Sequence, residues 1–128
     1  MLKRRLLIDA MNVLGSRADG WWNDPDRAMR ALVADLDGFA AERDDEVIAV
    51  LDKDPGSLPA VDHVEVVVAR RRGRNAADYE IEQIVAGAED PSLFTVVTSD
   101  KKLVEKVASL GARVTGAGTF RKRLDRSS

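Results

Sequence analysis

Short hydrophobic runs recur along the chain, and each is followed by polar residues or by a turn. Five of these runs predict β-strands, at residues 5–8, 47–51, 64–68, 94–98 and 113–115. The first two runs are almost entirely apolar, which is typical of strands buried on both faces of a parallel sheet. Glu65 interrupts the third run, and this charge favours a position at the sheet edge.

Apolar residues recur with the period of an α-helix between most of these strands. Asp24 followed by Pro25 predicts the start of the first helix, Asn75 is expected to cap the second, Gly111 to end the third, and Thr119 to cap the last. The residues expected to face the core are Met29, Leu32, Val33, Leu36, Phe39, Ala40, Ile81, Ile84, Val85, Ala88, Leu103, Val104, Val107, Leu110, Phe120 and Leu124.

The alternation of strands and helices predicts a three-layer α/β/α sandwich with a central five-stranded parallel sheet and right-handed crossovers. The segment 53–63 is the exception, because its two prolines and one glycine predict a loop. The chain has 128 residues, of which 45% are apolar and 33% charged, so a single domain over residues 1–128 is expected. Open sheets of this kind bind ligands beyond the carboxyl ends of their strands.

Four aspartates are predicted to lie on that rim. Asp9, Asp52 and Asp100 follow the first, second and fourth strands, and Asp78 lies in the first turn of the helix after the third strand. Carboxylates that meet at one edge repel each other unless a divalent cation lies between them. We therefore interpret the four aspartates as a metal site, and their oxygen ligands suit magnesium or manganese.

Each aspartate also has a simpler structural interpretation. Asp78 comes three residues after Asn75 and could complete a capping box, and Asp100 could cap the next helix. Asp9 and Asn12 could shape a turn by binding backbone amides. Taken one at a time, these roles are the commoner ones. Their joint occurrence on one predicted rim favours the metal site, because caps have no reason to converge.

The composition excludes several other chemistries. The chain has no cysteine, which rules out disulfides, thiol nucleophiles and thiolate zinc sites. His63, the single histidine, stands at the mouth of a strand, where an exposed histidine is commoner than a catalytic one. No P-loop motif is present, so no nucleotide cofactor is expected. No apolar stretch approaches the length of a membrane span, and the chain start runs into a strand, so we expect a cytoplasmic protein with no membrane partner.

Basic residues cluster at positions 3–5, 70–74 and 121–126, although the net charge is −2. One cluster alone would be a solvated face, but three clusters close to an acidic metal site favour a polyanionic substrate. The cluster next to Asp78 is expected to grip phosphates, and it consists of Arg70, Arg71, Arg72 and Arg74. Trp21 and Trp22 either stack on unpaired bases or anchor the loop before the first helix.

Three motifs carry a resemblance to a known family. They are the D-x-x-N turn of residues 9–12, the A-D-x-x-I helix start of residues 77–81 and the T-S-D turn of residues 98–100. In this order, and over nearly the whole chain, the sequence resembles an NYN domain of the PIN-like ribonuclease group, in its YacP-like branch. The resemblance implies the strand order 3-2-1-4-5. One departure is Ala10, where the family frequently has glycine.

The resemblance implies a metal-dependent endoribonuclease that binds magnesium or manganese and acts on RNA. Its catalytic set would be Asp9, Asn12, Asp78 and Asp100, with Asp52 as a further acidic position. We expect Asn12 and Ser99 to contact substrate or a metal-bound water. Two alternatives stay open: a non-catalytic RNA- or ribosome-binding module of the same fold, and the toxin of a toxin–antitoxin pair. The sequence leaves open the RNA target, including whether it is ribosome-associated mRNA, and the oligomeric state.

Overall fold

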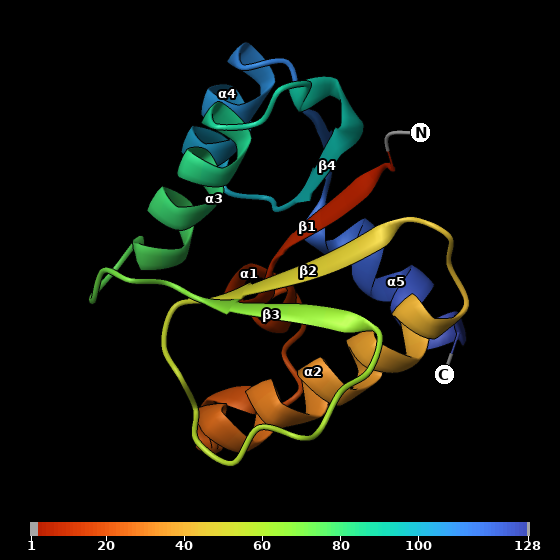
Figure 1. Cartoon of the computed structure of the whole chain (residues 1–128). Helices are drawn as coiled ribbons and strands as arrows, with labels where there is room; N and C mark the ends of the chain where they lie inside the picture. The colour runs from red at the N-terminus through yellow and green to blue at the C-terminus, as the bar shows by residue number, and fades with distance from the viewer. Residues whose placement is uncertain (1–2, 128) are drawn as a thin grey trace.

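Five parallel strands form one sheet in the order β3-β2-β1-β4-β5 (Figure 1). The structure is a computed structural model and describes residues 3–127. The strands are β1 (Arg5–Asp9), β2 (Glu46–Leu51), β3 (Val64–Val68), β4 (Phe94–Val97) and β5 (Arg113–Thr115). The predicted number of strands, their parallel direction and their order are therefore confirmed.

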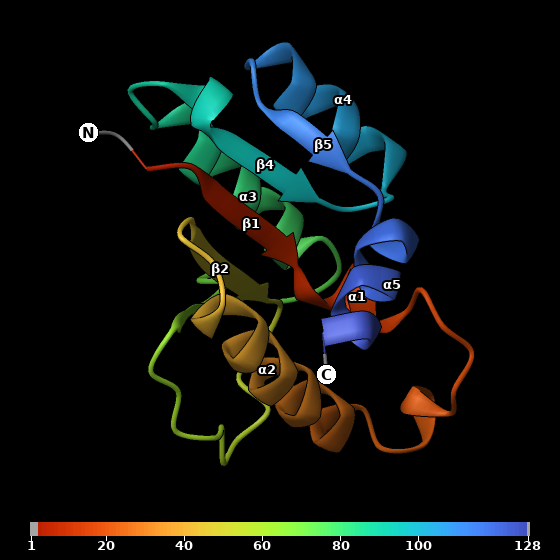
Figure 2. The same cartoon turned by 90° about the vertical axis from the view of Figure 1, so that its right-hand side faces the viewer.

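Helices cover both faces of this sheet. They are α1 (Ala10–Leu14), α2 (Pro25–Ala41), α3 (Ala76–Ala86), α4 (Lys101–Ser109) and α5 (Ala117–Ser127), with short 3₁₀ turns at Trp21–Asn23 and Pro91–Leu93. In Figures 1 and 2, α2 and α5 lie on one side of the sheet and α3 and α4 on the other. The predicted three-layer architecture is confirmed. None of the helices described here is long and apolar enough to cross a membrane.

The sheet separates two hydrophobic clusters. Ile8 packs with residues of α1, α2 and α5 on one face, including Leu36 and Phe120. Leu7 packs with residues of α3 and α4 on the other face, including Ile81 and Leu103. Successive side chains of a strand point to opposite faces, and both Leu7 and Ile8 are completely buried. The uninterrupted apolar run of β1 thus reflects burial on two sides.

The helix starts agree only partly with prediction. Asp24 caps α2 as expected, through its carboxylate. Asn75 stands at the N-cap position just before α3, in a left-handed conformation with a φ of 70°, but its side chain makes no capping hydrogen bond, so the predicted side-chain cap is absent. Thr119 does not begin the last helix either. α5 begins at Ala117, whose backbone N–H donates to Oγ of Ser99 at 2.8 Å.

Two further details differ from the expected helices. Leu110 was expected in the buried stripe of α4, but it follows the last helical residue and is 37% exposed. Gly111 does end that helix, with a φ of 103°, which favours glycine. The D-x-x-N turn after β1 is a short helix, α1, that begins at Ala10. Ala10 is buried and does not have a positive φ, so this position does not require the family's glycine.

The loop between β2 and β3 contains no helix, as predicted, and it is fastened to α2 by one carboxylate. Oδ1 of Asp37 accepts hydrogen bonds from the backbone N–H groups of Asp62, His63 and Val64, at 3.1, 2.7 and 3.0 Å. These bonds, led by the one from His63, lower the pKa of Asp37. The side chain of Asp37 therefore fixes the point at which β3 begins.

Candidate active site

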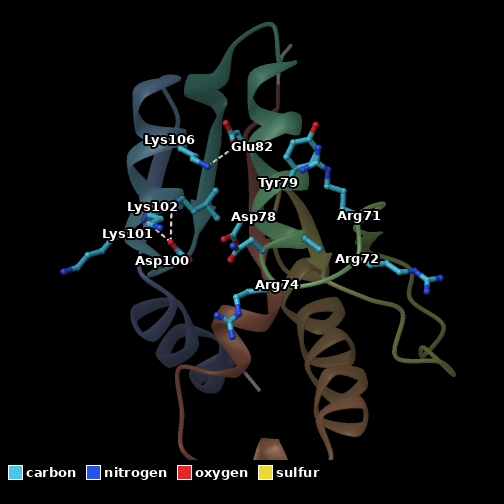
Figure 3. A pocket seen from close by; sticks show the side chains of 13 residues that line it. Arg71, Arg72, Arg74, Asp78, Tyr79, Glu82, Asp100, Lys101, Lys102 and Lys106 are labelled. Atoms are coloured by element: carbon cyan, nitrogen blue, oxygen red, sulfur yellow. Dashed lines mark hydrogen bonds and ion pairs between the residues drawn. The ribbon is translucent and has the colours of Figure 1, made fainter.

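A cleft with a volume of about 720 Å³ opens between α3 and α4, beyond the carboxyl ends of the strands (Figure 3). Six basic and three acidic side chains line it: Arg71, Arg72, Arg74, Lys101, Lys102, Lys106, Asp78, Glu82 and Asp100. Asp78 and Asp100 point toward one another across this cleft. The fold thus places two of the four predicted aspartates face to face in a basic surrounding.

Asp100 comes directly after the T-S part of the T-S-D turn and caps α4. Its Oδ1 accepts hydrogen bonds from the backbone N–H groups of Lys102 and Leu103, at 2.9 and 3.2 Å. The structural interpretation of this residue is therefore correct, but it does not exclude a role in the cleft. The cap uses only Oδ1, so Oδ2 remains available to Asp78 or to a cation.

Asp78 lies half-buried in the first turn of α3 and takes no part in a capping box. Its pKa is raised, first by burial and then by the negative charge and the hydrogen-bonding carboxyl of Asp100, while Lys106 acts in the opposite direction. Two carboxyl groups that face each other in this way need a shared proton or a cation between them. This is the electrostatic signature expected of a cation site.

Asp9 ends β1 and is only 4% exposed, so it lies beneath the cleft instead of lining it. Its pKa is raised to about 6, first by burial and then by the negative charges of Asp78 and Asp100, while hydrogen bonds from Thr98 and the backbone of Asn12 act in the opposite direction. Oγ1 of Thr98 donates to Oδ2 of Asp9 at 3.0 Å and accepts from the backbone N–H of Asp100 at 3.2 Å. Thr98 thus connects the two aspartates. The T-S-D motif was the signal that could have identified its role.

Asn12 and Ser99, predicted to contact the substrate, support the turn that carries Asp100. The backbone N–H of Ser99 donates to Oδ1 of Asn12 at 2.8 Å. Oγ of Ser99 in turn accepts from the backbone N–H of Ala117 at the start of α5. The two side chains therefore hold α1, the T-S-D turn and α5 together, and their contact with a substrate stays a prediction.

Asp52 is not brought to the other three aspartates. It lines a second cleft of about 620 Å³ on the far side of the arginine-rich loop, together with Lys53, Asp54 and residues 68–73. The two clefts share only Arg71 and Arg72. The charges of Asp9, Asp78 and Asp100 thus act on one another at the carboxyl ends of the strands, whereas Asp52 lies in the second cleft.

The carboxyl pair suits a hard divalent cation. Across residues 3–127, no three His, Cys, Asp or Glu side chains are grouped closely enough to form a complete metal site. Magnesium usually keeps several waters and takes only one or two protein carboxylates, so a pair is a sufficient protein contribution. Asp78 and Asp100 provide such a pair, and the charge of Asp100 is, after burial, the next cause of the raised pKa of Asp78.

Residues 6–128 match the family model of the YacP-like NYN domain. The chain belongs to this family. Two crystal structures of Rae1 (YacP) from Bacillus subtilis have the same fold. One superposes with a TM-score of 0.75 at 21% identity and covers 99% of this chain and 75% of that one. The other, of a single-residue variant, gives 0.74 at 22% identity, with 96% and 75% covered. No curated protein matches the sequence.

The first arginine of this NYN domain's basic loop is held by a buried glutamate. The carboxylate of Glu80, 6% exposed, accepts from the backbone N–H of Arg70 at 3.1 Å and from its guanidinium at 3.4 and 3.3 Å. Burial raises the pKa of Glu80, but the bonds from Arg70 outweigh it, so the pKa is lowered. Glu80 was missed, although it stands in the quoted helix-start motif. Arg70 accordingly fixes the start of the loop.

The remaining arginines of the loop reach the cleft. Arg72 and Arg74 have no ion-pair partner within the described part of the chain, and a left-handed Gly73, with a φ of 100°, lies between them. The expectation of three basic clusters near the site was wrong. Residues 3–5 lead into β1 at the opposite end of the sheet, and Arg121 in α5 pairs with acids on the other face. Lysines of α4, which were not predicted, supply the rest of the basic rim.

The tryptophans of the NYN domain lie away from this cleft. Trp21 packs against the cluster formed by α1, α2 and α5, and it lines a separate pocket beside Arg121. The loop-anchoring interpretation is therefore the one the structure supports for Trp21. Trp22 is 54% exposed and lines neither cleft described above.

Proposed function

We propose that this chain is a divalent-cation-dependent endoribonuclease whose active site is the cleft between α3 and α4. The observation that carries the proposal is the facing pair of Asp78 and Asp100 inside a rim of six basic side chains. A basic groove alone would bind a polyanion without cutting it, and a bare acidic pair would repel phosphate. Together they suit a phosphodiester and a cation. The resemblance to PIN-like ribonucleases supports RNA as the substrate.

In this proposal Asp78 and Asp100 would hold a magnesium or manganese ion. When bound, such an ion neutralises a phosphodiester oxygen and lowers the pKa of a bound water. The chain's own residues bind and orient the substrate around it. Arg72, Arg74 and Lys101 attract the phosphates on either side of the scissile bond. Asp9 adds negative charge beneath the cleft, and the hydrogen bond from Thr98 fixes the position of the Asp9 carboxylate.

The test is RNA cleavage by the purified protein with manganese or magnesium, with and without a chelator. Asp100→Asn is a sharp variant, because asparagine caps a helix as well as aspartate does and the fold of α4 is retained. Cleavage is expected to fall by at least about 100-fold, the effect typical of removing one group that stabilises a transition state. RNA binding by this variant should persist.

Asp52→Asn is the matched control, because it removes the same charge from a position outside the cleft. It should retain the activity of the unaltered protein. An unaltered protein that binds RNA but never cuts it with added manganese would support the non-catalytic module instead. Equal loss in both variants would show that the proposed pair is not the centre of the chemistry.

A further inference from the structure

One aromatic side chain borders the proposed active site. Tyr79 follows Asp78 in the first turn of α3, lines the same cleft and is 37% exposed. Cζ of Arg71 lies over its ring, 3.5 Å from the ring centroid (Figure 3). The result is a two-layer stack of flat groups next to the carboxyl pair.

This stack is built from residues that the fold holds in place. Arg71 directly follows Arg70, which Glu80 anchors through backbone and side-chain hydrogen bonds. Tyr79 belongs to a helix whose adjoining residues are buried in the core. A ring and a guanidinium held face to face present a rigid planar surface of low conformational entropy. Surfaces of this kind stack on nucleobases.

The first turn of α3 carries both Tyr79 of this stack and Asp78 of the carboxyl pair. The helix begins without a side-chain cap, and the first N–H group, that of Ala76, donates to the carbonyl of Gly73 at 3.3 Å. Such a helix start attracts phosphate, and Arg72 and Arg74 also line the cleft. An RNA strand that crosses the first turn of α3 would thus pass phosphate-binding groups, Asp78 and the Tyr79–Arg71 stack.

We propose that the Tyr79–Arg71 stack receives an unpaired base next to the scissile phosphate. The inference rests on the proposed nuclease function and adds to it a base-binding contact made by two named residues. In a duplex the bases are already stacked and paired, so a protein ring reaches them only in single strands, loops and bulges. The stack therefore selects unpaired substrate, and the basic rim supplies the sequence-independent affinity.

The sequence offers a direct probe of this contact, because the chain has one tyrosine and two tryptophans. In a Trp21→Phe, Trp22→Phe, Asp100→Asn background, fluorescence comes from Tyr79 alone. A single-stranded RNA oligonucleotide is expected to quench this emission on binding, and a duplex of the same sequence is not. RNA that binds by anisotropy but leaves the emission unchanged would overturn the inference.

A second measurement avoids the altered tryptophans. In the Asp100→Asn protein alone, Tyr79→Leu should weaken binding of the single strand about 10-fold, the loss typical of one stacked base, and leave duplex binding unchanged. Tyr79→Phe keeps the ring and should bind normally. Trp22→Leu is the matched control, because it removes an exposed ring outside the cleft. Equal binding of the single strand by Tyr79→Leu and Tyr79→Phe would overturn the inference that this stack receives a base.

The two proposals fail separately. If these variants bind alike while the unaltered protein still cuts RNA in an Asp100-dependent way, only the stacking inference is lost. If the unaltered protein neither binds nor cuts RNA, the nuclease proposal is lost as well. A response of Tyr79 to a protein ligand but to no RNA would also contradict both.

Discussion

Asp37 and Asp9 have the same side chain but opposite electrostatic environments. Asp37, on the α2 face, meets three backbone N–H donors, and its pKa is lowered. Asp9, at the carboxyl end of β1, meets one hydroxyl and two further carboxylates in a buried position, and its pKa rises to about 6. Burial and the number of donors that the fold supplies, and not the residue type, decide whether an aspartate stabilises the structure or is left with an unmet charge.

The same contrast separates the two faces of the sheet. On the face of α2 and α5, Arg121 pairs with Asp19 and Asp125, and Arg17 also pairs with Asp125. On the face of α3 and α4, two carboxyl groups point at each other, and several basic side chains around them have no acidic partner in residues 3–127. The α3–α4 face therefore keeps both acidic and basic side chains that form no ion pair within the described residues. Such a surface suits the binding of an external cation together with a polyanion.

Asp9→Asn is expected to have the largest effect of the changes considered, on both RNA cleavage and stability. Removing the charge beneath the floor is expected to reduce RNA cleavage by at least about 100-fold. The same change should raise the free energy of unfolding at pH 7 without added cation, by up to about 3 kcal/mol, because the buried charge is gone. Chemical denaturation and a cleavage assay measure the two effects. A variant that is less stable yet fully active would contradict the role assigned to Asp9.

Asp9 also predicts the pH dependence of stability. Its pKa is about 6 when folded and 3.8 ordinarily, so the folded chain binds the proton more tightly. Its contribution to the unfolding free energy should therefore fall as pH rises from about 4 to about 6, by up to about 3 kcal/mol, and then level off. Manganese at 100 times its Kd should restore about 2.7 kcal/mol at pH 7. Denaturation series at several pH values check this, with Asp9→Asn as the control that should lack the decline.

Asp37 should behave in the opposite way. Its pKa is lowered in the folded chain, so its contribution is present above about pH 4 and is lost as pH falls through the folded pKa. Asp37→Ala is expected to lower the unfolding midpoint at pH 7 and to speed hydrogen exchange at the amides of residues 62–64. The gap between this variant and the unaltered protein should close below about pH 4. RNA cleavage at a temperature where the variant is folded should not change. A loss of cleavage there would indicate that the β2–β3 loop acts in the site.

Glu80→Gln should give the smallest effect. The amide keeps the size and one acceptor but loses the charge that holds Arg70. The arginine-rich loop then loses its fixed start, and we expect a several-fold rise in KM for RNA with little change in kcat, since the carboxyl pair is untouched. Steady-state kinetics distinguish this from Asp9→Asn, which should act on kcat. A fall in kcat without a change in KM would place Glu80 in the chemistry.

The strands and their order could be predicted because apolar runs and family motifs are properties of neighbouring residues. Asp9, Asp78 and Asp100 could be predicted for the same reason, since strand ends and helix starts place them on one rim. The position of Asp52 was predicted wrongly. Parallel strands end at the same edge of a sheet, but this rule does not say on which side of the arginine-rich loop after β3 a residue at a strand end will lie. The role of Ser99 was also beyond local reasoning, because Ala117, its partner, belongs to a distant helix.

The link from Ser99 to α5 has a consequence for biosynthesis. Asn12, Ser99 and Ala117 form one hydrogen-bonded chain, and Asp9 meets Thr98 across 89 positions. Contacts this distant in sequence form only after the intervening chain is available. The hydrogen bonds that hold the T-S-D turn between α1 and α5 can therefore form only after Ala117 has been synthesised, so the support of the turn that carries Asp100 is completed late in translation.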